Sequence, residues 1–451
     1  MRNTNGIFRR PTLLWRRYGA RRTADQLDIW RRRTATGLGA ILLALFALLF
    51  ARVCDEAQRL FNALTSLSPW LPLALTPLAF GLSALIMSRK LSSTRGSGIP
   101  QVIAAAREPR NALLVSLVSL KTAAAKFFMT IIVLFGGGSF GREGPTVQIS
   151  AAIMVATHRL FRVPLTPGVI IAGGAAGVSA AFNTPLAGVS FAIEELAAAY
   201  EQRVAVLVMA AVMIAGLTSL GVAGDYVYFG TTHESLGLGS ALMLAPVVGV
   251  AGGITGGLFS RLLLLWLRSG AKWLQPIRRR PVSAAIGCGL IVAILGVSSG
   301  GATFGTGYEH TRFLVEGGGQ AIWIWPAKFL ATLASSATGV PGGVFAPSLS
   351  VGAGLGDALA PLFPGLPVGA LVILGMVAHF TGVVRSPLTA VIILSETTGS
   401  HGMILPLFAT ALIADGVSTL ICRERLYHAL AKPFLAPLDQ ASADAAPKPT
   451  A

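Results

Sequence analysis

Apolar residues recur along the chain in runs of unequal length, and short stretches rich in glycine and proline separate these runs. Some runs are long enough to cross a lipid bilayer, or nearly so: residues 36–52, 70–88, 113–135, 204–224 and 242–267. Others are too short to span a bilayer alone: residues 147–161, 168–181, 186–200, 344–361 and 387–399. The pattern therefore predicts an all-α membrane protein that crosses the bilayer many times.

The short runs predict helices that begin or end inside the membrane. The chain contains 52 glycines and 25 prolines, and both residue types interrupt helices. A helix broken within a bilayer is tolerated only where protein or a water-filled cavity covers the freed backbone groups. We therefore expect many tilted, broken helices that cover one another's ends or line a watery cavity.

Composition supports a membrane protein and argues against a soluble one. Hydrophobic residues make up 53% of the chain and charged residues only 12%. The mean hydropathy is +0.68. A soluble protein of this length would need far more charge to cover its surface.

The net charge of +17 could suggest a nucleic-acid partner, but the positions of the basic residues indicate a membrane orientation instead. Ten arginines lie within residues 1–33, and residues 52–70 and 225–240 are poor in lysine and arginine. Further basic stretches are residues 89–95, 106–110, 267–281 and 422–432. Basic segments face the cytoplasm and its anionic lipid. We expect cytoplasmic termini and no nucleic-acid partner.

Cysteine and histidine positions favour neither a metal site nor a disulfide framework. Cys54, Cys288 and Cys422 are scattered, and the six histidines show no HExxH spacing. No phosphate loop of the GxxxxGK[ST] type and no constellation of nucleophile and base is present. We expect no cofactor and no enzymatic activity.

An internal repeat relates two segments of the chain. Residues 180–196 (AAFNTPLAGVSFAIEEL) align without a gap with residues 382–398 (GVVRSPLTAVIILSETT). Pro185 then matches Pro387, and Glu194 matches Glu396, so the offset in residue number is 387 − 185 = 202. A repeat of this kind is typical of transporters whose binding site lies between two related halves.

The same offset aligns two further motifs. Residues 141–148 (GREGPTVQ) fall on residues 343–350 (GVFAPSLS), and Ser97-Gly98 falls on Ser299-Gly300. We predict a basic N-terminal segment (1–35), a transport domain (36–437) and a short disordered tail (438–451). The transport domain would consist of two related halves, at about 36–220 and 240–425.

Three glycine-rich turns that enter predicted helices indicate anion binding. They are GSGIP at 96–100, GREGP at 141–145 and GVFAP at 343–347. A helix start presents unpaired N–H groups and the positive end of the helix dipole, and glycine lets a ligand approach the backbone closely. Each turn alone could be a simple helix break, but their agreement with the repeat favours an anion site.

The sequence resembles the CLC family of chloride channels and proton/chloride exchangers, in its bacterial form. The resemblance rests on GSGIP, GREGPTVQ, residues 180–196, GGVFAPSLS at 342–350 and the tyrosine in RERLYHAL at 423–430. It extends from about residue 40 to residue 432. It implies a CLC-like fold with two inverted-topology halves, and a homodimer in which each subunit has its own anion pathway. It also implies a bacterial inner-membrane location.

The resemblance also implies site residues. The hydroxyl groups of Ser97 and Tyr427 would bind a central chloride, together with backbone N–H groups, and a second set of N–H groups would form an outer site. Alternatively, Ser97 could be a helix cap and Tyr427 an interfacial anchor. The full chloride-binding set implied is Ser97, Gly98, Ile99, Arg142, Glu143, Gly144, Val344, Phe345 and Tyr427.

Two acids would carry the protons. Glu143 matches the gating glutamate of the family, whose carboxylate competes with the anion for the outer site and leaves that site when protonated. A purely structural Glu143 paired with Arg142 is the alternative. Glu195 matches the internal proton-transfer glutamate, and its presence favours an exchanger, whereas Glu194 is expected to have a structural role.

The expected function is exchange of chloride for protons across the membrane. A passive chloride channel of the same family is the first alternative, and a cation-coupled solute carrier is a distant one. Expected partners are chloride, protons, membrane lipid and a second copy of the chain. The sequence assigns no role to Lys126, a basic residue near the expected pathway, or to Gln101, which follows GSGIP where an acid is common in relatives.

Overall fold

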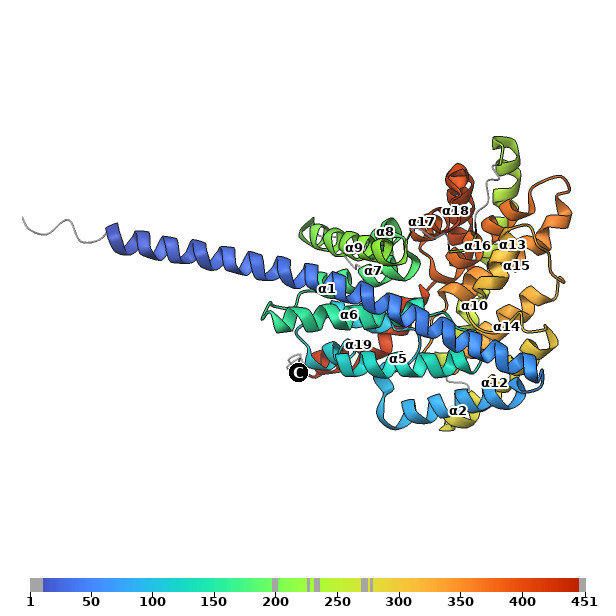
Figure 1. Ribbon diagram of the computed structural model, residues 1–451, viewed down its shortest axis with the longest axis horizontal. Coiled ribbons are helices and arrows are strands. Elements are labelled where there is room, and N and C mark those ends of the chain that lie inside the picture. The colour runs from blue at the N-terminus through green and yellow to red at the C-terminus, as the bar shows by residue number, and fades with distance from the viewer. Residues whose placement is uncertain are drawn as a thin grey trace, which may run out of the picture.

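The computed structural model describes residues 11–196, 202–224, 228–230, 236–268, 275 and 279–445. These residues form a bundle of helices (Figure 1). Within them, the only β pairing is a two-residue antiparallel bridge between Gly141 and Gly343. The all-helical fold predicted from the apolar runs is confirmed.

The helices differ widely in length, as the uneven apolar runs predict. In chain order they are α1 (Pro11–Leu67), α2 (Pro72–Lys90), η1 (Ser92–Thr94), α3 (Ile99–Arg107), α4 (Ala112–Ser116), α5 (Leu120–Phe135), α6 (Glu143–Leu160), α7 (Pro167–Phe182), α8 (Pro185–Phe191), η2 (Ala192–Leu196), α9 (Gln202–Ala223), α10 (Leu238–Arg268), α12 (Pro281–Ser298), α13 (Tyr308–Val315), α14 (Ile324–Ala337), α15 (Phe345–Leu359), η3 (Ala360–Leu362), α16 (Val368–Val384), α17 (Pro387–Thr398), η4 (His401–Met403), α18 (Ile404–Ile421) and α19 (Leu426–Ala445).

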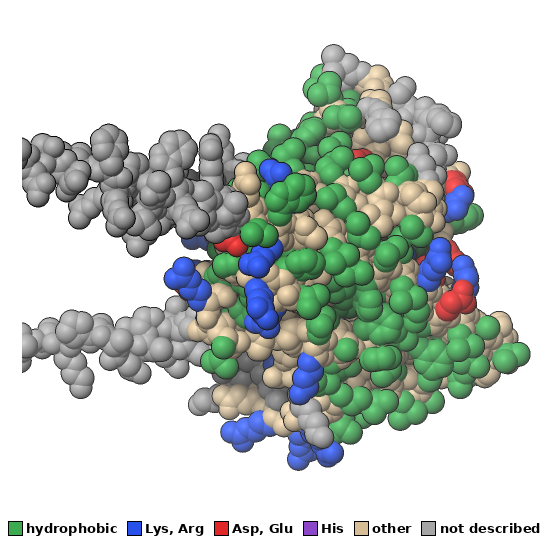
Figure 2. Space-filling view, turned by 60° about the vertical axis from the view of Figure 1, so that its left-hand side comes forward, with side chains coloured by type: hydrophobic (Ala, Val, Ile, Leu, Met, Phe, Trp, Pro, Cys, Tyr) green, Lys and Arg blue, Asp and Glu red, His purple; other side chains and the backbone are tan. Residues whose placement is uncertain are grey.

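Six of the described helices are long and apolar enough to cross a membrane. They contain the spans Gln26–Leu67, Pro72–Arg89, Ala205–Ala223, Gly239–Arg268, Pro281–Ser298 and Ile404–Ile421. Apolar side chains cover a broad face of the molecule, and charged side chains gather at its two ends (Figure 2). A surface with an apolar belt and charged ends suits a protein that crosses the bilayer many times.

Several element bounds differ from the sequence prediction. The predicted long run 113–135 is divided between α4 and α5, while the spans 281–298 and 404–421 were missed. The first helix begins at Pro11, within the predicted basic segment, and continues unbroken through the first apolar run. The last helix extends to Ala445, beyond residue 438 where a tail was expected, and residues 446–451 lie outside the described part.

Long-range packing joins helices from distant parts of the chain. Helix α1 packs against α5, α6, α7 and α9, and α10 packs against α16 and α18. Helix α2 packs against α12, although the two helices belong to different predicted halves of the chain (Figure 1). Most of the core is formed by small or aliphatic side chains, so the helices approach closely, as membrane helices do.

Equivalent residues of the two predicted halves make reciprocal contacts. The N–H of Gly141 donates to the carbonyl of Gly343, and the N–H of Gly343 donates to the carbonyl of Gly141, both at 2.7 Å. The two helices that follow, α6 and α15, begin at Glu143 and Phe345, which are related by the same offset as Gly141 and Gly343. The aligned motifs therefore meet at the centre of the fold.

In a second reciprocal contact, two acidic side chains cap the starts of two short helices. The carboxylate of Glu194 accepts hydrogen bonds from the N–H groups of Leu388 and Thr389, at 2.9 and 2.7 Å, in the first turn of α17. The carboxylate of Glu396 accepts from the N–H of Ala187, at 3.3 Å, in the first turn of α8. Each acid satisfies helix N–H groups that would otherwise be unpaired, and its charge suits the positive end of the helix.

Candidate anion and proton site

Three helix starts meet at Gly144. A side chain on Gly144 would contact both Ser97 Oγ and the Cα of Gly343, so the backbones before α3 and α15 lie directly against the first turn of α6. Gly98, which precedes α3, has a φ of 109°, a value that favours glycine. The first N–H groups of each helix have no partner within that helix. The convergence predicted from the three glycine-rich turns is therefore present.

Two hydroxyl groups face this meeting point from one side. Ser97 Oγ and Tyr427 Oη are buried and lie close to each other, and neither makes a well-formed hydrogen bond with a described residue. Both residues, with Val344, line a cavity of about 180 Å³ that also contains Arg95 and Arg268, and we call it the inner cavity. Two buried hydroxyl donors beside free helix starts, in a cavity with two cations, form a surface suited to a small anion.

The ring of Tyr427 is held by aromatic packing rather than at a membrane interface. It is 1% exposed, and its centroid lies 5.9 Å from that of Phe345. The Phe345 ring in turn packs edge-to-face against Phe191 and Phe380. The alternative role of Tyr427 as an interfacial anchor is therefore wrong. Phe345 contributes its ring to the core, so any contact with an anion must come from its backbone.

Glu143 lies where the starts of α6 and α15 meet. Its side chain is 1% exposed, and its Oε2 atom accepts a hydrogen bond of 3.4 Å from the N–H of Ala346, in the first turn of α15. Its Oε1 atom accepts a short hydrogen bond from the hydroxyl of Tyr308. The carboxylate therefore uses a helix-start donor of the type that would bind an anion.

Arg142 does not pair with Glu143. Its Nη1 atom forms an ion pair with Asp55 at 2.5 Å and donates to the carbonyl of Ala51 at 2.6 Å, while Nη2 donates to the hydroxyl of Tyr228. The alternative of a structural Glu143–Arg142 pair is therefore wrong. Arg142 instead fixes the start of α6 against α1.

Tyr308 and Tyr228 were missed by the sequence analysis. Their rings meet edge-to-face with centroids 4.5 Å apart, and the Arg142 guanidinium lies over both. Tyr308 also lines a second cavity of about 170 Å³, with Asp55 and Thr306, which we call the outer cavity. Tyr308 thus lies between this cavity and the carboxylate of Glu143.

A signal for Tyr308 was present in the sequence. Residues 305–309 read GTGYE and repeat the Gly-x-Gly pattern of GSGIP at 96–100. Gly305 and Gly307 have positive φ values of 59° and 81°, as Gly96 and Gly98 have of 65° and 109°. Helix α13 begins directly after Gly307, as α3 does after Gly98.

The alignment of Ser97-Gly98 with Ser299-Gly300 is therefore wrong. Ser299 follows the end of α12, whereas Gly98 precedes the start of α3. The structural counterpart of Gly98 is Gly307, because each glycine directly precedes the start of a helix. The offset between these two turns is thus larger than the offset between the later motifs, and a single ungapped alignment could not find both.

Two buried lysines hold these turns, which gives Lys126 a role. Lys126 Nζ donates to the carbonyls of Thr94 and Gly96, at 2.8 and 2.5 Å. Lys328, which the original offset pairs with Lys126, donates to the carbonyls of Thr303 and Gly305, at 3.0 and 2.9 Å. Each lysine satisfies carbonyl groups that have no helical partner, and the Gly96 carbonyl also accepts a longer hydrogen bond, of 3.4 Å, from the N–H of Gly342.

Gln101 supports the first turn from α3. Its Nε2 atom donates to the carbonyl of Arg95 at 2.5 Å and to that of Ser93 at 3.3 Å. The residue also lines the inner cavity. Gln101 thus holds the chain before Ser97.

Glu195 lies beside His428, near the start of α19. It is fully buried in η2, and its Oε2 atom accepts a hydrogen bond of 3.0 Å from Ser386. Its Oε1 atom has no hydrogen-bond partner among the described residues and lies 3.4 Å from Nδ1 of His428. The neighbouring Glu194 has all its carboxylate contacts with the start of α17. The two adjacent acids therefore have different surroundings, as expected.

Comparison with known proteins identifies the family. The family model described as voltage gated chloride channel matches residues 79–419. The chain belongs to the CLC family of voltage-gated chloride channels and related transporters. Members of this CLC family transport ions and are not enzymes.

Named CLC relatives and solved CLC structures agree with this assignment. A protein of Yersinia pestis bv. Antiqua (strain Angola), named H(+)/Cl(-) exchange transporter ClcA, is 31% identical over 89% of this chain and 87% of its own. A protein of the same name from Yersinia pseudotuberculosis serotype IB (strain PB1/+) is 32% identical over 81% of this chain and 80% of its own.

Two solved structures match across nearly the whole CLC fold. A slow cyanobacterial Cl−/H+ antiporter matches with a TM-score of 0.77 and 25% identity, covering 91% of this chain and 99% of its own. A CLC-type fluoride/proton antiporter matches with a TM-score of 0.70 and 23% identity, covering 88% and 97%. The protein is thus a multi-pass integral membrane protein with a CLC-like fold and transports anions.

Proposed function

We propose that this protein exchanges chloride for protons across a bacterial inner membrane. Glu143 acts as the gate, and Glu195 passes protons on the cytoplasmic side. The chloride site consists of the Ser97 and Tyr427 hydroxyls with the N–H groups at the starts of α3, α6 and α15. The names of the ClcA relatives and of the cyanobacterial antiporter support chloride and proton as the exchanged pair.

The position of the Glu143 carboxylate carries this proposal. It binds the N–H of Ala346 in the first turn of α15, a donor that an anion at this position would also need. A charged carboxylate and an anion therefore compete for the same donors. Protonation removes the competitor, and a bound anion raises the proton affinity of the displaced acid, so the two ions are coupled.

The surroundings of Glu195 support a separate proton route. Glu195 is buried on the same side of the fold as the inner cavity, but it is not among the residues that line that cavity. Its unpartnered Oε1 atom can accept a proton without breaking a structural contact. An ionisable side chain inside a membrane protein is expensive and is typical of a proton relay.

Basic residues support the orientation. The inner cavity contains Arg95 and Arg268, which belong to basic stretches expected in the cytoplasm. The outer cavity contains Asp55 and Glu309, and its α1 wall belongs to the stretch 52–70 that was expected outside. Cytoplasmic termini and a homodimer remain part of the proposal.

Transport by purified protein in liposomes tests the exchange. We expect wild-type protein in a chloride gradient to drive protons uphill, with chloride and pH recorded together. Glu143→Gln should carry chloride without protons and lose its dependence on external pH. Glu309→Gln, which removes an acid of the outer cavity, is the matched control and should retain exchange.

Glu195→Gln tests the inner acid in the same assay. It should carry chloride and move no protons, because it keeps the shape of the side chain and removes its titration. Glu194→Gln should instead lower expression or stability, because it weakens the start of α17. Chloride flux without any proton movement in wild type would identify a passive channel, and proton-coupled transport by Glu143→Gln would refute the proposed gate.

A further inference from the structure

His428 connects the buried acid Glu195 with the solvent. It follows Tyr427 in the third position of α19, and its side chain is 39% exposed. Its Nδ1 atom is nevertheless buried, has no hydrogen-bond partner, and lies 3.4 Å from Oε1 of Glu195. Glu195 Oε1 is likewise buried and unpartnered. One ring therefore has a buried nitrogen facing the acid and an exposed part facing outward.

From this contact we propose that His428 is the group that takes protons from the cytoplasm and delivers them to Glu195. The proposal rests on the proposed exchange of chloride for protons and extends its proton route to the surface. Histidine suits this role because it is the side chain that ordinarily gains and loses a proton near neutral pH.

The transfer balances without another reactant. With Nδ1 turned toward solvent, the neutral ring takes a proton at Nδ1 from hydronium, which becomes water, and the ring becomes imidazolium with a proton on each nitrogen. Rotation of the ring about its Cβ–Cγ bond then brings the Nδ1–H group to Glu195. The Nδ1–H bond breaks, a new O–H bond forms at Glu195 Oε1, and the ring is left neutral with its proton on Nε2, so it can turn back and take the next proton. The 3.4 Å separation is longer than an ordinary hydrogen bond, so the transfer requires the two atoms to approach each other more closely.

Two acids and one hydroxyl group near this contact are already engaged. The Glu194 carboxylate binds the start of α17, and the Ser386 hydroxyl donates to the other oxygen of Glu195. Glu424 binds Lys432 and Arg268. These contacts leave Oε1 of Glu195 and Nδ1 of His428 facing each other.

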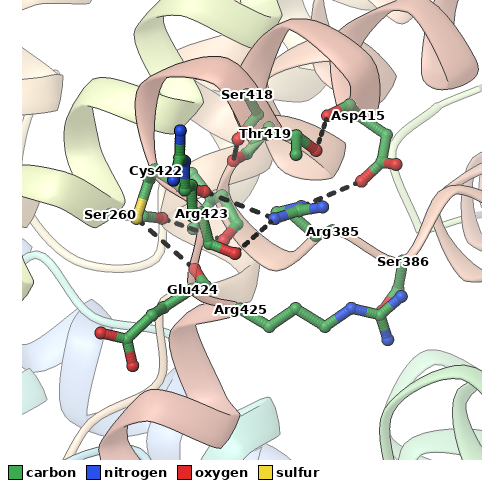
Figure 3. Close-up of polar contacts among 12 residues, drawn as sticks. Ser260, Arg385, Ser386, Asp415, Ser418, Thr419, Cys422, Arg423, Glu424 and Arg425 are labelled. Carbon is green, nitrogen blue, oxygen red and sulfur yellow. Dashed lines mark hydrogen bonds and ion pairs between the residues drawn. The ribbon is translucent and has the colours of Figure 1, made fainter.

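The cations near this contact are engaged as well. Arg425 donates to the backbone carbonyl of Glu194 at 3.1 Å, and its side chain extends toward Ser386 (Figure 3). Arg385 binds Asp415 at 3.1 Å and the carbonyls of Cys422 and Arg423 (Figure 3). Since arginine does not release its proton at physiological pH, neither of these cations can replace the histidine as a carrier.

Substitution of His428 in liposomes tests the proposal. We expect His428→Gln to fold as wild type does, because the side chain is partly exposed, and to reduce proton flux at least fivefold relative to chloride flux. His428→Arg keeps a positive charge but has no proton to give, so it should be equally impaired. Lys432→Gln, which removes an exposed cation one turn later on α19, is the matched control and should retain the wild-type ratio of protons to chloride.

Chemical rescue distinguishes proton delivery from a structural role. Imidazole in the buffer should restore proton flux to His428→Ala several-fold and leave Glu195→Gln inactive for protons. Wild-type proton flux in His428→Gln or His428→Arg would overturn this inference, as would the absence of rescue. A wild-type protein that moves no protons would overturn the proposed exchange together with it.

Discussion

The two Gly-x-Gly turns of this protein share one construction and present different chemistry. Gly96-Ser97-Gly98 and Gly305-Thr306-Gly307 both precede a helix, and a buried lysine binds the carbonyls of each. The first turn lines the inner cavity and offers the buried Ser97 hydroxyl. The second lines the outer cavity and is followed by Tyr308, which binds the proposed gate.

The difference shows how a repeated framework obtains two functions. The lysines and glycines that set the backbone are the same in both turns, whereas the residues that touch the pathway differ. In the inner turn a buried serine hydroxyl makes no well-formed hydrogen bond with a described residue, and after the outer turn a tyrosine hydroxyl donates to Glu143. We therefore expect substitutions in the framework to lower stability alike at both turns, and their effects on transport to differ with the residues that each turn presents.

The largest expected effect comes from the lysines. Lys126→Met and Lys328→Met should each lower the thermal unfolding temperature by several degrees, because a buried carbonyl that loses its donor costs about 1–3 kcal/mol. Calorimetric titration with chloride then separates the two variants. Lys126→Met should bind chloride more weakly, and Lys328→Met should bind it normally. An equal loss of affinity in both variants would show that the turns are not specialised.

Tyr308→Phe should give the next largest effect. It removes the hydroxyl that donates to Glu143 and keeps the ring. A hydrogen bond to a charged group contributes about 1.5–3 kcal/mol, so chloride should displace the carboxylate more easily and turnover should rise about tenfold. Stopped-flow chloride efflux from liposomes measures this rate. Tyr228→Phe is the control, because it removes a hydroxyl that accepts a hydrogen bond from Arg142. Unchanged turnover in Tyr308→Phe would show that the Tyr308 hydroxyl does not hold the Glu143 carboxylate in place.

Ser97→Pro should change selectivity by a smaller factor. It removes a hydroxyl donor from the inner turn and leaves the helix starts in place, so the preference for chloride over nitrate should fall several-fold. Anion fluxes under matched gradients measure this ratio. Thr306→Pro is the equivalent change in the outer turn and should leave selectivity unchanged. A shift in both variants would assign anion discrimination to both turns.

The smallest expected effect is a pH-dependent change in stability that involves Glu424. A hydrogen bond from Lys432, together with one from Arg268, lowers the pKa of the Glu424 carboxyl, which lies in the loop between α18 and α19. This stabilisation is present above the ordinary pKa of the carboxyl and is lost as the pH falls through the lowered value. The group is largely solvated, so the effect is small.

Melting curves of wild type and Glu424→Gln measure this effect. Wild type should be slightly more stable at pH 7, and the two proteins should converge at acid pH. Asp55→Asn, which weakens the buried Arg142 contact beside the outer cavity, should destabilise the protein more than Glu424→Gln does at pH 7. A larger destabilisation by Glu424→Gln than by Asp55→Asn would contradict the expectation that the buried contact beside the outer cavity contributes more to stability than the exposed one.

Much of the fold and of the candidate site could be predicted because the residues concerned act through local backbone chemistry. The positions of glycine and proline indicated the helix starts near Ser97, Glu143 and Phe345. The repeat offset also paired Glu194 with Glu396, and the structure shows these two acids in equivalent contacts.

The missed features depend on tertiary contacts. Tyr308 touches Glu143 from a distant position in the chain, and the GTGYE pattern can place Tyr308 at a helix start but not against Glu143. His428 meets Glu195, although Glu195 belongs to the first predicted half and His428 follows the end of the second. The second Gly-x-Gly turn was hidden because its offset from the first is larger than that of the other motifs, so an ungapped comparison places it too early, at Ser299-Gly300.

The bridge between Gly141 and Gly343 has the form of a contact between identical subunits. Two equivalent residues exchange the same pair of hydrogen bonds, as they would across a twofold axis. In a true pair of identical chains, an acid two residues later would occur on both sides, and two like charges would repel each other at the centre. A single polypeptide removes that symmetry. It places Glu143 on one side and Phe345 on the other, so only one of the two related helix starts carries a carboxyl group, and under the proposed exchange that single group is the competitor of one anion.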